Sequence, residues 1–180
     1  FVVGTGGLHA SVNNRVYEAD ANHMILDIDV TSLYPSIAIG QGYYPEHLGK
    51  QFVSTYRTLR TQRIGYKKGS AENAMLKLAL NGVYGASGDK FSIFYDPLFT
   101  MKITIGGQMM VLMLVERLMR LKSVEIIQAN TDGITLSMNR DVYAEVKYSC
   151  DYWEKMTNLT LESVQYSKMA IRDVNNYLAV

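Results

Sequence analysis

Two aspartates, each at a point where an apolar strand pattern ends or turns, constrain the fold of this chain more than any other feature. Residues 23–30 form one apolar run, which ends at Asp29 and Val30. Residues 124–129 and 133–138 form two more, joined by the hairpin signal Asn130-Thr131-Asp132-Gly133. Helical patterns lie between them without regular strand–helix–strand alternation. This order favours an α+β fold in which helices cover one face of an antiparallel sheet.

The composition is typical of a globular protein in a reducing compartment. Of the 180 residues, 48% are hydrophobic and 19% are charged, and the net charge of +1 singles out no class of partner. The single cysteine, Cys150, excludes an internal disulfide framework and a cysteine-based zinc cluster, so we expect a cytoplasmic protein. No signal peptide and no apolar run of about 18 residues is visible, so we expect no membrane association. Since the chain begins with Phe1, we expect it to be a piece of a longer protein.

Two helical patterns separated by a short breaker predict an antiparallel helical hairpin. Residues 51–68 are helical and basic, Gly69-Ser70 interrupts the pattern, and residues 71–84 are rich in alanine and leucine. Further helices are predicted at residues 98–122 and 140–156.

Both ends of the chain have strand patterns. Residues 1–18 predict a glycine-rich loop followed by a β-hairpin that turns at Asn13-Asn14. The tail from Leu161 to Val180 alternates like strands and breaks near residues 173–176.

Asp29 and Asp132 are the carboxylates best placed for chemistry. Two carboxylates on adjacent strands could hold a pair of Mg²⁺ ions, which prefer oxygen ligands and complete their shells with water and phosphate oxygens. Two such metals, about 4 Å apart, can activate an attacking hydroxyl and stabilise a leaving pyrophosphate. The alternative is that both are turn aspartates that accept hydrogen bonds from nearby backbone N–H groups. Asp27 lies on the same strand face as Asp29 and is expected to have a supporting or structural role.

The helical hairpin carries a second set of polar residues. Lys77, Asn81 and Tyr84 share one helical face by their spacing. On the preceding helix, three cationic residues also share one face by their spacing: Arg60, Arg63 and Lys67. If the two helices run antiparallel, both faces could bind the same triphosphate. An ordinary solvated face is the alternative.

Tyr34 follows Asp29 by five residues, and its ring could lie flat under a bound sugar. A ring in that place leaves no room for a 2′-hydroxyl and would select deoxynucleotides by steric exclusion. A core tyrosine, one of 13 in the chain, is an equally good reading of this residue alone.

Three segments together resemble motifs of the family B DNA polymerases. DVTSLYPS at residues 29–36 is similar to the first palm motif, D-x-x-S-L-Y-P-S. KLALNGVYG at residues 77–85 is similar to the fingers motif, K-x-x-x-N-S-x-Y-G, and ANTDG at residues 129–133 to the second palm motif, whose core is D-T-D-S. The resemblance implies a palm-type sheet with an inserted fingers hairpin: palm at 1–50 and 89–180, fingers at 51–88.

The resemblance also implies roles for individual residues. Asp29, Asp132 and the backbone carbonyl of Val30 would bind two Mg²⁺ ions. The nucleotide would meet the backbone at Ser32 and Leu33, the sugar-gating ring of Tyr34, and the polar side chains of Arg60, Arg63, Lys67, Lys77 and Asn81. The DNA would contact Gly6, Gly7, Tyr84, Gly85, Thr131, Asn176 and Tyr177.

Four positions depart from the family pattern. Gly82 and Gly133 stand where the motifs have serine, Asn130 where the second palm motif has its first aspartate, and Asn175 where a primer-binding lysine is expected. With these departures and its short fingers, the chain is more similar to phage or viral members of the family than to cellular replicases. A phage origin would place the protein in the host cytoplasm.

The expected function is that of the palm and fingers of a DNA-directed DNA polymerase, which adds dNTPs to the 3′-hydroxyl of a primer–template. The family's exonuclease and thumb regions would lie elsewhere in the same polypeptide, so this fragment is expected to be weakly active or inactive alone. Two alternatives remain at this stage: a non-catalytic nucleic-acid-binding domain on a palm-like sheet, and a polymerase remnant that has lost activity.

Overall fold

The computed structural model describes residues 2–4 and 7–180. The chain forms two compact units. The first, here called the sheet unit, comprises Phe1–Thr31 and Gly107–Val180, and the second, the helical unit, comprises Ser32–Gly106. The helix α4 (Pro97–Met119) begins in the helical unit and ends in the sheet unit.

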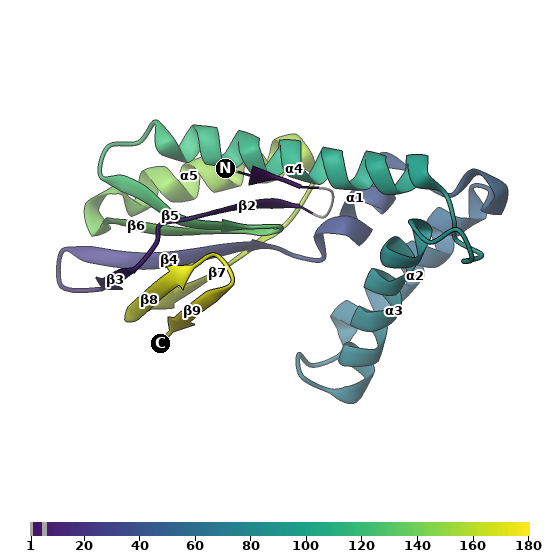
Figure 1. Cartoon of the computed structure of the whole chain (residues 1–180), viewed down its shortest axis with the longest axis horizontal. Coiled ribbons are helices and arrows are strands. Elements are labelled where there is room, and N and C mark those ends of the chain that lie inside the picture. The colour runs from purple at the N-terminus through teal and green to yellow at the C-terminus, as the bar shows by residue number, and fades with distance from the viewer. Residues whose placement is uncertain (1, 5–6) are drawn as a thin grey trace. The chain divides into compact units, whose positions relative to one another are not determined.

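The sheet unit contains two antiparallel sheets (Figure 1). The larger has six strands in the order β1 (Val2–Val3), β2 (Leu8–Ser11), β5 (Val124–Asn130), β6 (Gly133–Asn139), β4 (His23–Val30) and β7 (Leu161–Tyr166). The smaller has the order β3 (Arg15–Glu18), β8 (Lys168–Asp173) and β9 (Asn176–Ala179). After β6 a single 3₁₀ turn, η2 (Arg140–Val142), leads into the helix α5 (Tyr143–Thr157).

The side chains of β4 alternate between the two faces of the large sheet. Leu26 and Ile28 are buried toward α5 and line a small cavity with it. Ile25, on the other face, packs in one apolar cluster with Met169 and Ile171 of β8. Helix α5 therefore covers one face and the small sheet covers part of the other. Because strand side chains alternate, Asp29 shares the face of Ile25, away from α5.

The expected hairpin at Asn13-Asn14 is wrong. Strand β2 pairs with β5, and β3 pairs with β8, so the two strands belong to different sheets. Asn14 has a left-handed backbone with φ of 53°, which lets the chain turn from one sheet to the other. The tail forms three strands, which are separated at Ser167 and at the predicted break between Asp173 and Asn176. The predicted hairpin around Asp132 and the long helix near residue 100 are confirmed.

The helical unit contains α1 (Leu33–Gln41), the 3₁₀ turn η1 (Glu46–Leu48), α2 (Gln51–Gly65), α3 (Ala71–Ser87) and the first part of α4. Gly69, with φ of 84°, makes the turn between α2 and α3, and the Ser70 hydroxyl caps α3 by accepting the Asn73 N–H at 3.2 Å. Tyr56 of α2 is buried, and its hydroxyl donates to the Leu80 carbonyl of α3 at 2.5 Å. These contacts form the predicted antiparallel helical hairpin.

By length and composition alone, α4 could cross a membrane. Its most apolar window has a mean hydropathy of 1.6, and it is the single helix within residues 2–4 and 7–180 that meets this test. Core helices of soluble proteins meet it too, and 44% of this window is buried within the protein. The expected absence of membrane association remains a prediction.

Candidate active site

Strand pairing brings Asp29 and Asp132 close together. Asp29 pairs with Gly133 in the β4–β6 ladder, and Asp132 is the residue before Gly133, at the β5–β6 turn. Paired residues have Cα atoms about 4.5 to 5.5 Å apart, so Asp132 lies close beside this pair. The Val30 N–H donates to the Asp132 carbonyl at 2.7 Å, which ties the turn to the end of β4. Both aspartates are exposed.

Glu162 lies beside this pair and was not anticipated from the sequence. It faces Asp29 on β7, in the ladder on the other side of β4. Directly paired residues share a face of a sheet, so the Glu162 and Asp29 side chains emerge on the same side. Alternation in the tail predicted a strand there, but nothing local to residues 161–166 indicates that β4 is its neighbour.

The donor chemistry at this sheet edge fits Mg²⁺. Mg²⁺ is commonly held by one or two carboxylates, with waters and substrate phosphates completing its shell. In the part of the chain that the structure describes, no group of three or more His, Cys, Asp or Glu side chains could hold a metal ion. Asp29 and Asp132 therefore suit an ion that takes its remaining ligands from water and a substrate, and not an ion enclosed by protein ligands alone.

Asp27 has a structural role, one of the two roles that its strand position suggested. Its carboxylate accepts hydrogen bonds from the Thr135 hydroxyl at 2.7 Å and from the Tyr166 hydroxyl at 3.3 Å. Burial, and next the charge of Asp27, raise the pKa of the Tyr166 hydroxyl above its ordinary value. Asp27 thus links β4 to β6 and β7, directly behind Asp29.

The turn that carries Asp132 is also held from within. The Asn130 side-chain oxygen accepts a hydrogen bond from the Thr131 N–H at 3.1 Å. Asn130, which replaces the motif's first aspartate, thus stabilises the turn. Thr131 packs against Gly7, where a Cβ atom would lie only 2.5 Å from the Thr131 hydroxyl oxygen. Two of the predicted DNA-contacting residues are therefore neighbours. Gly6 lies outside the described residues.

In the helical unit, cationic side chains gather near the start of α1. Ser32, with a left-handed φ of 52°, precedes α1, and Arg63 of α2 donates a hydrogen bond to its hydroxyl. The first N–H groups of a helix lack partners within it and attract anions. Burial, and next the charge of Arg63, lower the pKa of Arg60. The Nε atoms of Arg60 and Arg63 are buried without a hydrogen-bond partner among the residues described.

Lys67 does not share the helical face predicted for it. Helix α2 ends at Gly65, and Tyr66 is extended, with φ of −90° and ψ of 146°. The Asn73 side chain of α3 donates to the carbonyls of Arg63 and Tyr66 at 3.0 and 3.3 Å and so completes the end of α2. Lys67 therefore lies in the turn.

Helix α3 presents the remaining predicted contacts of the helical unit. Lys77, Asn81 and Gly85 are exposed along it. The ring of Tyr84 stacks on that of Tyr34, with centroids 4.0 Å apart and planes at 28°. Tyr34 is thus braced by an aromatic partner from α3.

A buried hydroxyl on α4 orients Tyr84. The Tyr84 hydroxyl and the Thr104 Oγ1 are 2.6 Å apart, and the Thr104 hydroxyl donates to the Thr100 carbonyl at 2.9 Å. Because a hydroxyl has one proton, Tyr84 is the donor to Thr104.

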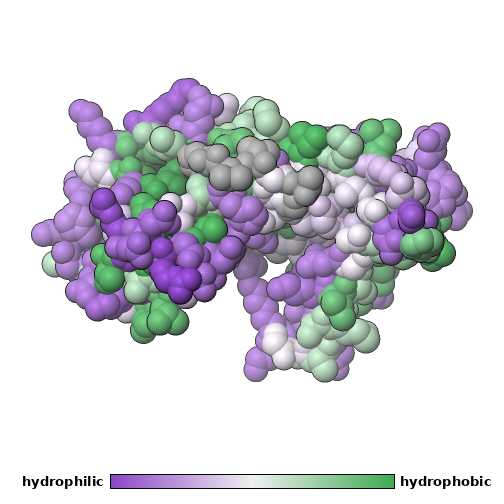
Figure 2. Space-filling view, in the orientation of Figure 1, coloured by the Kyte–Doolittle hydropathy of each residue, from purple (hydrophilic) through white to green (hydrophobic). Residues whose placement is uncertain are grey.

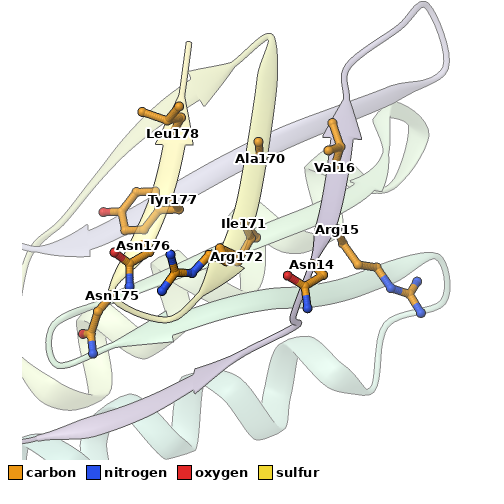
Figure 3. Close-up of a pocket in the computed structure, with 10 residues that line it drawn as sticks. All are labelled: Asn14, Arg15, Val16, Ala170, Ile171, Arg172, Asn175, Asn176, Tyr177 and Leu178. Atoms are coloured by element: carbon orange, nitrogen blue, oxygen red, sulfur yellow. The ribbon is translucent and has the colours of Figure 1, made fainter.

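The predicted primer-contacting residues Asn176 and Tyr177 line an open cleft of about 570 Å³ on the small sheet. Figure 3 shows its lining residues along β3, β8 and β9 and at the adjoining Asn14 and Asn175. Two arginines and three asparagines contribute to it; the lining comprises Asn14, Arg15, Val16, Ala170, Ile171, Arg172, Asn175, Asn176, Tyr177 and Leu178.

The charge of the cleft is mixed but favours anions. Arg172 pairs with Asp173 at 3.3 Å, whereas Arg15 adds a second cation to the lining. Figure 2 shows hydrophilic side chains over the small sheet and a hydrophobic patch near the C-terminal end, where Leu178 and Val180 are exposed.

Cys150 is half-buried on α5. Burial raises the pKa of its thiol to about 11, as does the negative charge of Asp151. A thiol with a raised pKa is a poor nucleophile at neutral pH.

Comparison with known proteins supports the fold. A scan of protein-family models returns no match, and neither does a search of curated proteins. The solved structure of the family B DNA polymerase from the hyperthermophilic archaeon Pyrobaculum calidifontis is similar to this chain, with a TM-score of 0.61 and 16% identity. The alignment covers 95% of this chain and 28% of that polymerase. The likeness confirms a polymerase-like α+β fold, while the suggested similarity to phage or viral members remains a prediction.

Proposed function

We propose that this chain is the palm and fingers portion of a DNA-directed DNA polymerase that adds dNTPs to a primer 3′-hydroxyl. The observation that carries the proposal is the pairing of Asp29 with the Asp132-Gly133 turn. Two residues 103 positions apart in the sequence come together at one exposed sheet edge, with the oxygen donors that Mg²⁺ prefers. The polymerase-like fold supports the same assignment.

Within this proposal, Asp29 and Asp132 would hold two Mg²⁺ ions, together with the Val30 carbonyl. When bound, the ions neutralise phosphate charge and favour ionisation of the primer hydroxyl. Asp27 keeps β4 in place beside β6 and β7 through its two hydrogen bonds. Glu162, across from Asp29, adds negative charge on the same face and favours cation binding.

The helical unit would bind the nucleotide. The start of α1 and the guanidinium groups of Arg60 and Arg63 offer N–H donors to the triphosphate, and a charge-assisted pair with phosphate is stronger than the present Arg63–Ser32 contact. Lys77 and Asn81 add exposed donors on α3. The Tyr34 ring, braced by Tyr84, would exclude a 2′-hydroxyl.

The sheet unit would bind DNA. The cleft on the small sheet offers Arg15 and Arg172 to primer phosphates and Tyr177 to a sugar or base. Gly7 and Thr131 would approach the template backbone closely because Gly7 has no side chain.

The test is addition of one nucleotide under single-turnover conditions, with the protein in excess over primer–template. This measures the chemical step without processive synthesis. Asp29→Asn and Asp132→Asn are each expected to reduce the rate roughly a thousandfold. The matched control is Asp20→Asn, an exposed turn aspartate that accepts the backbone N–H groups of Asn22 and His23 at 2.7 Å.

Retention of activity within about tenfold in Asp132→Asn would refute the catalytic assignment. DNA binding that does not depend on Mg²⁺ and is unchanged in Asp29→Asn and Asp132→Asn would instead favour a non-catalytic nucleic-acid-binding domain. The cleft on the small sheet is the feature that supports this second function.

A further inference from the structure

Gly133 makes room for the carboxylate of Asp29. A Cβ atom at residue 133 would lie 2.1 Å from Asp29 Oδ1 and 3.3 Å from its Cγ. Real Cβ atoms essentially never approach another atom so closely, so a side chain at this position requires the Asp29 carboxylate, the far end of a flexible side chain, to shift. A third close atom, the Ile28 carbonyl oxygen at 3.5 Å, belongs to the strand backbone.

The backbone at residue 133 does not itself require glycine. Among the residues that the structure describes, the glycines with positive φ are Gly42, Gly49 and Gly69, and Gly133 is not one of them. Gly133 is buried in the regular β4–β6 and β5–β6 ladders, paired with Asp29 on one side and Asn130 on the other. Space, and not backbone conformation, therefore accounts for glycine at this position.

Gly82 provides a direct contrast. Like Gly133, it stands where the polymerase motif has serine. A Cβ atom at Gly82 would meet nothing within 4 Å, because the residue lies on the exposed side of α3. One of the two missing serines is thus sterically harmless, and the other would collide with a predicted metal ligand.

We infer that Gly133 is a positioning residue for Asp29. Its missing side chain lets the Asp29 carboxylate lie against β6 beside the Asp132 turn. Restoring the motif's serine in this chain would displace that carboxylate and weaken divalent-cation binding. The inference rests on the proposed function, since it assumes that Asp29 and Asp132 bind the cation.

The experiment is a titration of the 180-residue chain with Mn²⁺, monitored by the electron paramagnetic resonance signal of the free ion. Mn²⁺ is used because it accepts the same oxygen ligands as Mg²⁺. Gly133→Ser and Gly133→Ala are each expected to weaken Mn²⁺ binding about tenfold. Gly82→Ser is expected to leave it unchanged.

Two further variants separate this inference from the proposed function. If neither Asp29→Asn nor Asp132→Asn weakens Mn²⁺ binding, the proposed metal site is wrong. If both weaken it and Gly133→Ser does not, the metal site stands and the role of Gly133 is refuted.

Thermal unfolding supplies a second readout that needs no metal. Because the exposed Asp29 carboxylate can move aside, the collision in Gly133→Ser should lower the Tm by only roughly 1 to 4 °C. Most of that loss should disappear when the same substitution is made in an Asp29→Ala background, which removes the carboxylate. An equal loss of Tm with and without the Asp29 carboxylate would show that Gly133 does not make room for Asp29. That conclusion would hold even if misfolding made Gly133→Ser bind Mn²⁺ weakly.

Discussion

A ring stack and two hydroxyl hydrogen bonds fix the orientation of Tyr34 in the helical unit. Tyr34 stacks on Tyr84, and Tyr84 donates its only proton to Thr104. Thr104 is buried on α4 and donates in turn to a backbone carbonyl. A ring fixed in this way cannot easily rotate aside to admit a larger sugar, which is what a steric gate requires.

Replacing Tyr34 should therefore relax sugar selection. Tyr34→Ala is expected to raise incorporation of ribonucleotides relative to deoxynucleotides by roughly a hundredfold, because a steric barrier is removed while the phosphate contacts stay. Single-nucleotide extension with matched dNTP and rNTP substrates measures the ratio. Tyr66→Ala, which removes an exposed ring from the same unit, is the control. An unchanged ratio in Tyr34→Ala would contradict the gate.

Cys150 should react slowly with thiol reagents. With the pKa of its thiol raised to about 11, only about one thiol in a thousand is ionised at pH 8. The reaction rate is expected to rise close to tenfold per pH unit between pH 7 and about 10, and to increase sharply on unfolding. A colorimetric disulfide reagent measures both, and fast labelling of the folded chain at pH 7 would contradict this prediction.

At the scale of helices and strands, side chains bind the unpaired backbone groups at the ends of helices and 3₁₀ turns. Asn73 of α3 completes α2, and the Asp96 carboxylate precedes α4, accepting the N–H groups of Phe99 at 2.9 Å and Glu46 at 3.0 Å. Burial opposes ionisation of Asp96, but these backbone hydrogen bonds outweigh it and hold the pKa of the carboxyl below its ordinary value of 3.8. Asp96 thus joins α4 to the η1 turn.

Asp96→Ala should lower the free energy of unfolding by about 1 kcal/mol at pH 7, the usual contribution of a helix cap. Because the folded pKa is depressed, the carboxylate stabilises the protein above pH 4, and this contribution disappears as the pH falls through the folded pKa, below 3.8. Urea unfolding at pH 7 and pH 3 measures the difference from the unmodified chain.

The control for this prediction is Asp141→Ala, at an exposed position in η2, which should change the free energy of unfolding by less than about 0.5 kcal/mol. If Asp96→Ala lowers the free energy of unfolding equally at pH 7 and pH 3, the charge of Asp96 does not contribute to stability.

At the scale of the whole molecule, the proposed activity depends on binding a duplex. The small sheet offers two arginines, but the position where the primer-binding lysine is expected holds Asn175. Asn175 lies in the β8–β9 turn, and its backbone N–H donates to Asp173 at 3.0 Å, a contact that a lysine at this position can also make. A longer cationic side chain here would extend the positive surface of the cleft.

Asn175→Lys is therefore expected to tighten primer–template binding and to steepen the plot of log K against log salt concentration by about 0.9, the value for one added phosphate contact. Arg172→Ala should weaken binding and flatten the plot. Lys155→Ala, on α5, is the control for loss of a cation elsewhere. Fluorescence anisotropy over a range of salt concentrations measures the slopes, and identical slopes for all four proteins would exclude the cleft from DNA binding.

The sequence by itself determined most of the local structure and the first candidates for the site. Apolar runs identified β4, β5 and β6, the Gly69-Ser70 breaker predicted the helical hairpin, and the pattern around Asp29 and Asp132 singled out those two carboxylates. Such signals are local, because periodicity and capping depend on residues a few positions apart.

Tertiary structure decided which strands are neighbours. It separated β2 from β3, left Lys67 beyond the end of α2, placed Glu162 across from Asp29, and brought the Asp29 carboxylate against Gly133. Strand pairing joins distant segments through packing of whole faces, so no pattern within one strand specifies its partner. For that reason the sequence identified the chemistry of the proposed site, and only the fold showed what surrounds it.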